Sequence, residues 1–150
     1  MTRYFEDFEV GDVYEPDGRY EVTEAEVLEF AERYDPQPFH LDKEAAEESI
    51  FGSLAASGWH TASMCMRLLV DGLLDEASMG ARGVEELRWN RPVYPGDTLR
   101  IEVEVLDKRP SESRPEIGHV RTKLVGYNQN DEAVIEWVAL GMFRRRNGDK

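Results

Sequence analysis

The sequence predicts an α+β domain in which a curved antiparallel sheet wraps one long, buried helix. Two observations carry this prediction. The chain changes character near residue 80, from mostly helical patterns before it to mostly strand patterns after it. The helical part also holds one long segment that is apolar on nearly every face. A sheet with one apolar face must bury it, and a long apolar helix is a suitable partner.

The first helix is expected to begin after Thr23, because Thr23-Glu24-Ala25-Glu26 has the form of a capping box. It should end before Pro36. A second, short helix is expected over 43–49, which is rich in Glu and Ala. The segment 34–40 between them holds two prolines in seven residues, so we expect a stiff loop there rather than regular helix.

The segment 58–74 is the long apolar helix. Its apolar residues follow helical spacing but also occupy the other faces, and Arg67 is its only charge before Asp71. A helix that is apolar nearly all round is normally buried. Ser57 fits as its N-cap, which leaves the backbone amides of the first turn, starting near Gly58, free to bind something.

The second half of the chain predicts strands. Residues 99–105 alternate apolar and charged side chains with a period of two, as a half-buried strand does. A second strand is expected over 118–127, and 133–143 is apolar on both faces except at Glu136, as in a central strand. Tight turns are expected at 95–97 and 128–131.

Bulk properties limit the classes of function. A chain of 150 residues with no linker predicts a single domain over 1–150. A net charge of −13 argues against a nucleic-acid partner. The single cysteine, Cys65, lies in an apolar run and is expected to be a buried thiol. The N-terminus lacks the apolar stretch of a signal peptide and no apolar run could span a bilayer, so we expect a soluble, cytoplasmic protein without membrane association.

One arrangement of residues points to chemistry. Asp35 and His40 lie on the proline-stiffened segment, and Gly58 begins the buried helix. Adding water to a double bond conjugated to a carbonyl needs a base, an acid and a donor for the carbonyl oxygen. A carboxylate, an imidazole and a free helix amide supply these groups. Spacing alone leaves another interpretation open, in which Asp35 caps the chain and His40 makes a local hydrogen bond.

Two other chemistries are weaker. A metal site could be built from a set of His and Asp side chains in this region: Asp35, His40, Asp42 and His60. No HExxH or comparable spacing occurs, so we expect no metal. A hydrolase nucleophile at Ser57 or Ser63 lacks the G-x-S-x-G elbow.

Two segments form recognisable motifs. The segment 35–42 reads Asp-Pro-Gln-Pro-Phe-His-Leu-Asp, with a His five residues after an Asp, and the segment 87–99 contains Pro-Val-Tyr-Pro-Gly-Asp-Thr-Leu. The first resembles the hydratase signature and the second the Pro-Val-x-Pro-Gly-Asp-x-Leu strand and turn of the MaoC-like family of acyl-CoA dehydratases, in particular of its (R)-specific enoyl-CoA hydratases. The resemblance spans nearly the whole chain. It implies a hotdog fold and reversible hydration of a 2-enoyl-CoA to a 3-hydroxyacyl-CoA, without metal or organic cofactor.

The resemblance also implies residue roles. Asp35 and His40 would hold and activate water and move the proton at the α-carbon, in a division of labour that the sequence leaves open. The amide of Gly58 would polarise the thioester carbonyl. Ser63 would orient His40, or would simply be a small residue that permits close helix packing. Trp59 and His60 would shape the acyl pocket, with a core position as the alternative for Trp59.

The chain departs from the family pattern at three places. Tyr34 replaces the usual Gly before the Asp, Gln37 replaces the usual Asn, and Ser57 replaces a common His before the glycine. The bulk of Tyr34 and Trp59 predicts a pocket suited to short or branched acyl chains.

The remaining expectations concern ligands, partners and competing functions. Arg88, Arg91 and the cluster 144–146 suit the phosphates of CoA, or form a solvated strand face and tail. The resemblance implies a homodimer or higher homo-oligomer in which two sheets join. Alternative functions are an acyl-CoA thioesterase, because hotdog folds serve both, and a non-catalytic subunit that binds acyl-CoA or acyl-carrier protein.

Overall fold

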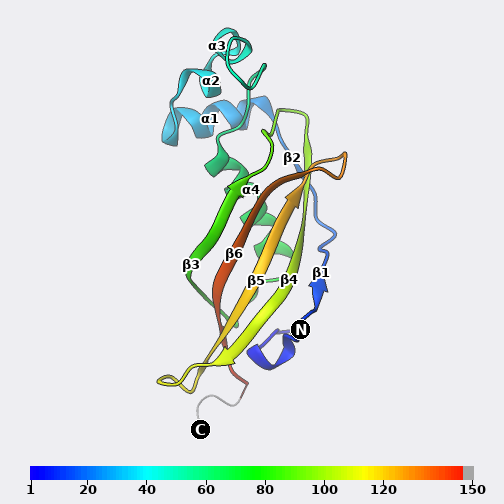
Figure 1. The fold of residues 1–150 in the computed structure, drawn as a ribbon, viewed down its shortest axis with the longest axis vertical. Coiled ribbons are helices and arrows are strands. Elements are labelled where there is room, and N and C mark those ends of the chain that lie inside the picture. The colour runs from blue at the N-terminus through cyan, green and yellow to red at the C-terminus, as the bar shows by residue number, and fades with distance from the viewer. Residues whose placement is uncertain (147–150) are drawn as a thin grey trace.

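The computed structural model describes residues 1–146, and Figure 1 shows a long, twisted sheet with the longest helix packed behind it and three shorter helices at one end. None of the helices in this range is long and apolar enough to cross a membrane. In chain order the elements are the 3-10 helix η1 (Phe5–Asp7), β1 (Val13–Tyr14), β2 (Tyr20–Glu21), α1 (Glu24–Tyr34), α2 (Pro38–Leu41), α3 (Lys43–Glu47), α4 (Gly58–Gly72), β3 (Ser78–Trp89), β4 (Thr98–Pro110), β5 (Ile117–Tyr127) and β6 (Ala133–Arg144).

The sheet is antiparallel throughout. Its strands pair in the order β1-β4-β5-β6-β3, and β2 pairs with another part of β4. Two long hairpins, β4–β5 and β5–β6, form its centre and run without a crossover. The predicted α+β class with an antiparallel sheet is therefore confirmed.

The predicted strands are confirmed with small changes at their ends. In β4 the alternating side chains Leu99, Ile101, Val103 and Val105 are all buried. The strand continues to Pro110, beyond the apolar alternation that located it. β3, which the sequence did not predict as a separate strand, is interrupted by three register shifts, and Glu86 has a φ of 52°. Such bulges are common in edge strands and disrupt the periodicity that would reveal them.

α4 lies against the sheet along one face. Its residues Met64, Cys65 and Leu68 pack into the main core. The helix approaches β5 so closely that a Cβ on Gly126 would lie 2.7 Å from the sulfur of Cys65. The thiol is fully buried, as predicted, and burial raises the pKa of Cys65 to about 12.

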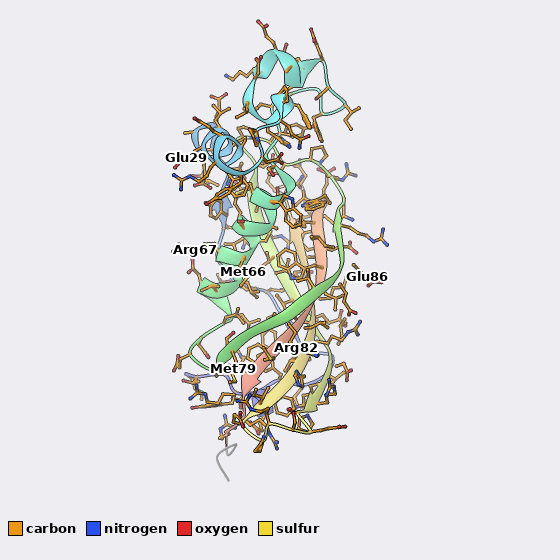
Figure 2. The ribbon with its side chains drawn as sticks, turned by 90° about the vertical axis from the view of Figure 1, so that its left-hand side faces the viewer. Glu29, Met66, Arg67, Met79, Arg82 and Glu86 are labelled. Atoms are coloured by element: carbon orange, nitrogen blue, oxygen red, sulfur yellow. The ribbon has the colours of Figure 1, made fainter. Side chains whose placement is uncertain are left out.

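The prediction that this helix is buried on all sides was wrong. Trp59, Met66 and Val70 of α4 are 57%, 43% and 46% exposed. Figure 2 shows Met66 and Arg67 on the outward side of α4. The sheet covers only one side of the helix. No other segment of the described chain covers the opposite side, so this apolar stripe is exposed to solvent.

The prediction of a loop over 34–40 was also wrong at its end. A short helix, α2, begins at Pro38 and contains His40. Proline is tolerated at the first helical position because its missing N–H has no partner there.

The other two helices lie where they were predicted, with changes in detail. Thr23 caps α1 by accepting from the Glu26 amide, but the Glu26 side chain bonds to Tyr20 and His60 and not back to the Thr23 amide, so only half of the predicted capping box forms. α3 begins after Asp42 as expected and ends at Glu47, two residues early.

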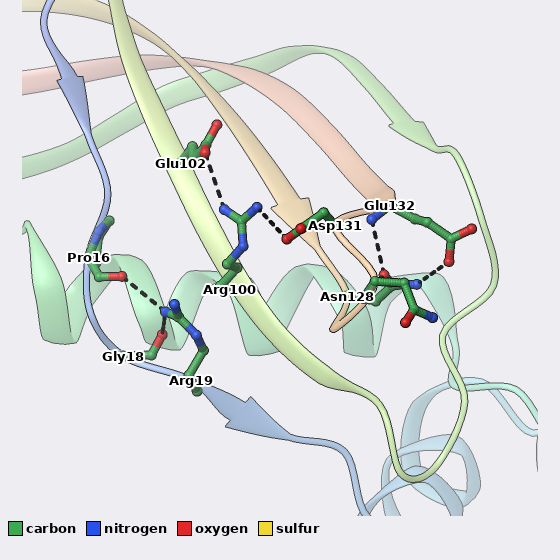
Figure 3. A network of polar contacts seen from close by, with 9 residues as sticks. Pro16, Gly18, Arg19, Arg100, Glu102, Asn128, Asp131 and Glu132 are labelled. Atoms are coloured by element: carbon green, nitrogen blue, oxygen red, sulfur yellow. Dashed lines mark hydrogen bonds and ion pairs between the residues drawn. The ribbon is translucent and has the colours of Figure 1, made fainter.

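The predicted turn at 128–131 joins β5 to β6 and is held by a polar network (Figure 3). Asn128 Oδ1 accepts from the amides of Asn130 and Glu132. Arg100 on β4 donates to both Glu102 and Asp131, at 3.2 and 3.0 Å. This network links the turn to the neighbouring strand β4, at the end of the sheet that lies nearest the short helices (Figure 1).

Candidate active site

Asp35 is the C-cap of α1, and both of its carboxylate oxygens accept hydrogen bonds. Ser57 Oγ donates to Oδ2 and Gln37 Nε2 donates to Oδ1, each at 2.7 Å. Burial raises the pKa of Asp35, but the hydrogen bonds from Ser57 and Gln37 outweigh it and hold the pKa below its ordinary value, and a protonated His40 lowers it further. The carboxylate is therefore ionised at neutral pH.

His40 is 5% exposed and lies on α2. Its Nδ1 lies 2.7 Å from the carbonyl oxygen of Ala55. A carbonyl only accepts, so Nδ1 carries the proton and, in the neutral ring, Nε2 keeps a free lone pair. This Nε2 lies 3.5 Å from Asp35 Oδ2, longer than a normal hydrogen bond. An acceptor nitrogen and a carboxylate oxygen thus lie side by side, in a position to share a water molecule.

Gly58 begins α4 directly after its N-cap, Ser57, whose hydroxyl accepts from the Trp59 amide. Within residues 1–146, no carbonyl or side chain accepts from the N–H of Gly58. The indole of Trp89 packs against Gly58 and donates to its carbonyl at 2.8 Å, and a Cβ at position 58 would lie 2.5 Å from that ring. Only glycine lets the indole lie so close to the start of the helix.

These groups share a cavity of about 360 Å³. Asp35, His40, Gly58 and Trp59 all line it, so four of the predicted site residues come together. Its other walls combine apolar side chains with four polar ones. The apolar members include Phe39, Phe51, Trp89, Pro92 and Val93, and the polar members are Gln37, Thr61, Asn90 and Arg91. The cavity thus combines an apolar lining with an ionised carboxylate, an imidazole and a free amide.

The domain model described as "MaoC like domain" matches residues 7–127. The chain belongs to this family. A crystal structure of a MaoC-like dehydratase from Rhodospirillum rubrum superposes with a TM-score of 0.89 at 46% identity, covering 96% of this chain and 98% of that one.

Two further relatives bear on activity and fold. A 3-hydroxybutyryl-CoA dehydratase from Methylorubrum extorquens is 32% identical over 143 residues, which is 91% of this chain and 82% of the relative. A Mycobacterium tuberculosis protein described as having a double hotdog fold matches with a TM-score of 0.81 at 16% identity, over 97% of this chain and 45% of that one. The predicted hotdog fold is confirmed.

The other predicted site residues of this MaoC-like chain line a second cavity, of about 290 Å³, between α1 and α4. Tyr34, His60 and Ser63 lie there, with Phe30 and Arg33 among the other lining residues. Their roles in substrate binding stay predictions.

Ser63 and Trp59 each had two interpretations from the sequence, and their contacts distinguish between them. Ser63 Oγ donates to the Trp59 carbonyl at 2.8 Å, and among residues 1–146 it makes no hydrogen bond to His40. Trp59 is exposed and packs edge-on against Trp89 at 5.1 Å, so it does not occupy a core position.

The basic residues separate into groups. Arg91 lines the first cavity and pairs with Glu132 at 3.3 Å. Arg145 and Arg146 instead pair with Glu6 and Asp7 of η1, at the other end of the sheet.

Among the described residues, no three His, Cys, Asp or Glu side chains are grouped so that they could hold a metal ion. His60 bonds to Glu26 and does not lie with Asp35, His40 and Asp42 in the arrangement that a metal site would need.

Sequence reasoning missed several contacts of the site. It assigned Ser57 to capping but not to the Asp35 carboxylate, and it did not involve the Ala55 carbonyl or Trp89. The Gln37 amide, noted only as a departure from the family pattern, turns out to bind Asp35. The one available signal was the position of Ser57 itself, a predicted helix cap directly before Gly58, whose amide was already assigned to the site.

Proposed function

We propose that this MaoC-like chain is a hydro-lyase that reversibly adds water to a 2-enoyl-CoA thioester, with Asp35 and His40 activating the water. The observation that carries the proposal is the pairing of the free Nε2 of His40 with the Asp35 carboxylate at 3.5 Å inside an apolar cavity. The dehydratase name of the Methylorubrum extorquens relative supports the same class of reaction.

The residues divide the reaction as follows. The Asp35 carboxylate accepts one O–H of a water molecule, and His40 Nε2 removes the other proton as the oxygen bonds to C3 of the substrate. The π electrons of the double bond move toward the thioester, and the Gly58 N–H stabilises the resulting charge on the carbonyl oxygen. His40, then cationic and beside Asp35, returns its proton to C2. Water is consumed, and no metal or organic cofactor is needed for the balance.

The cavity and the surface suggest how the rest of the substrate binds. Arg91 is the basic residue of this cavity and is proposed to meet a CoA phosphate after exchanging its bond to Glu132. The bulk of Trp59 at the cavity favours short or branched acyl chains. Faster turnover of long-chain than of short-chain enoyl-CoA would contradict that preference.

A homodimer is also proposed. The long edge strand β3 has no partner on its outer side within the described chain, and it carries the exposed Val84. The exposed Met66 of α4 lies on the same side of the molecule as β3 (Figure 2). Pairing through β3 would cover both surfaces and remove an open sheet edge.

The test is a spectrophotometric assay with a short 2-enoyl-CoA, which follows loss of the conjugated thioester absorbance while free thiol is measured in parallel. We expect absorbance loss without thiol release, and a fall of roughly 10²–10⁴-fold in kcat for Asp35→Asn and His40→Gln. Matched controls are Asp71→Asn, on the exposed end of α4, and His119→Gln, on β5; both should keep wild-type rates.

The other outcomes are equally informative. Thiol release in place of simple absorbance loss would make the protein a thioesterase. No turnover across several chain lengths, with acyl-CoA still bound, would make it a binding subunit.

A further inference from the structure

The second cavity contains a chain of three hydrogen-bonded side chains that the proposed reaction does not use. Both the hydroxyl of Tyr20, on β2, and His60 Nε2, on α4, bond to Oε1 of Glu26, on α1. The distance from His60 Nε2 to this oxygen is 3.0 Å. Three separate elements therefore meet at one carboxylate oxygen.

Glu26 is the acceptor of both bonds. Its hydrogen bond from Tyr20 lowers its pKa, burial acts in the opposite direction, and His60 lowers the pKa further, so the net shift is downward. Burial, followed by the bond to Glu26, raises the pKa of Tyr20 to about 12. The ionised carboxylate can only accept, so Tyr20 remains a donor and His60 carries its proton on Nε2.

His60 is held on its flat face as well. Its ring stacks on Phe30 at 4.7 Å with an interplanar angle of 8°, and the residue is 3% exposed. Its Nδ1 is buried and has no hydrogen-bond partner within the described part of the chain. Burying an imidazole with one unpaired nitrogen costs free energy of folding that an apolar side chain would not cost. We therefore expect its bond to Glu26 to have a functional role.

α1 is therefore attached to the first turn of α4 by polar bonds at both of its ends. Glu26, in the first turn of α1, bonds to His60, and Asp35, at its C-cap, bonds to Ser57. Glu26 and Asp35 are nine positions apart in the sequence, which corresponds to about 13 Å along a helix. A single attachment would let α1 pivot about Ser57, whereas two attachments this far apart set the direction of the helix and hence the place of Asp35.

We propose that His60 is a positioning residue which, through Glu26 and Tyr20, holds α1 at the angle that places the Asp35 carboxylate beside His40. The proposal rests on the proposed function for its catalytic consequence, but its structural content concerns only the two helices. A displacement of about 1 Å at reacting groups can lower the rate about 10²-fold. A contact outside the cavity that Asp35 and His40 line (the dyad cavity) can therefore control turnover.

The experiment compares His60→Phe with Glu26→Gln and with Glu29→Gln. Phenylalanine keeps the stacking on Phe30 and removes the bond to Glu26, whereas a glutamine at 26 can still accept from both partners. Glu29 lines the same cavity on the same helix, and no hydrogen bond joins it to His60 among the described residues, which makes it a matched control.

We expect His60→Phe to lower kcat by up to about 10²-fold with little change in KM. The substitution displaces Asp35 relative to His40 and leaves the residues that contact the substrate in place. Glu26→Gln should retain part of the rate, and Glu29→Gln all of it. The double variant Glu26→Gln, His60→Phe should be no worse than His60→Phe alone, because the bond between the two residues is already absent in His60→Phe.

A second readout does not depend on activity. The chain has three histidines, so the imidazole NMR signals of His40 can be assigned with single-histidine substitutions. We expect the chemical shifts of the His40 ring to change in His60→Phe but not in Glu29→Gln. If the wild-type protein hydrates no enoyl-CoA, the proposed function fails while this shift still supports the positioning role. Unchanged His40 signals in folded His60→Phe would overturn the inference, as would a wild-type kcat in that variant.

Discussion

The hydroxyl of Ser57 donates a 2.7 Å hydrogen bond to Asp35 Oδ2, so the N-cap of α4 and the C-cap of α1 meet at the candidate catalytic carboxylate. Ser57 is fully buried, and its oxygen also accepts from the Trp59 amide. The Ser57 side chain therefore caps α4, whose first amide is free, and also stabilises the negative charge of the Asp35 carboxylate.

Replacing Ser57 by alanine should change both properties. Loss of the cap should reduce the free energy of unfolding by about 1 kcal/mol. Because the Ser57 bond lowers the pKa of Asp35, its loss should raise that pKa, so activity that needs the ionised carboxylate should disappear at a higher pH as the solution is acidified. A pH profile of kcat/KM measures this. Thr23→Ala, which removes the cap of α1, is the control: it should cost similar stability without moving the acidic limb.

Gly58→Ala should displace Trp89, because the new Cβ would lie 2.5 Å from the indole ring. We expect a changed tryptophan fluorescence spectrum and a lower rate of hydration, since the indole lines the dyad cavity. Gly83→Ala on β3 is the control, because a Cβ there meets no atom within 4 Å. Wild-type fluorescence and activity in Gly58→Ala would mean that the close approach is not required.

Cys65 should report global unfolding. It is fully buried and burial raises its pKa to about 12, so the native thiol stays protonated and inaccessible at pH 8. We expect a thiol reagent to label the native protein only at the rate of unfolding and to label it at once in denaturant. Rapid labelling of the native protein would contradict the packing of α4 against the sheet.

Gly126→Ala should destabilise the core by roughly 1–3 kcal/mol, the usual cost of overpacking. The added Cβ would lie 2.7 Å from Cys65 Sγ and 2.8 Å from Ile135 Cγ2. Denaturant unfolding measures this cost. Adding Cys65→Ala should restore part of the loss, because it removes one of the two clashes, and strictly additive losses would argue against this contact.

The proposed homodimer predicts that a charge on the open apolar surface separates the subunits. Met66→Glu and Val84→Glu should shift the mass measured by light scattering from dimer toward monomer. Val13→Glu is the control: Val13 is also exposed, at 56%, but lies on β1, at the opposite edge of the sheet. A monomeric wild-type protein would refute the dimer.

Much of this molecule follows from local sequence patterns. The alternation at 99–105 located β4 and the Thr23 cap located α1, and these features depend only on neighbours within a few residues. The spacing of Asp35 and His40 left two interpretations open, and the resemblance to the MaoC-like motif was needed to assign them to a candidate catalytic pair. Where local rules compete, the sequence pattern failed: Pro38 was taken as a helix breaker, although proline is also a good first residue of a helix.

The contacts that complete the site depend on tertiary structure. His40 bonds to a carbonyl 15 residues away, Asp35 to a hydroxyl 22 residues away, and Glu26 to an imidazole 34 residues away. Such pairs leave no periodic trace in the sequence, since they form only when α1, α2 and α4 pack together at the end of the sheet. The sequence by itself determined which chemical groups are present and where along the chain they stand. Only the packing of those elements decided which nitrogen of His40 is free and which oxygen it faces.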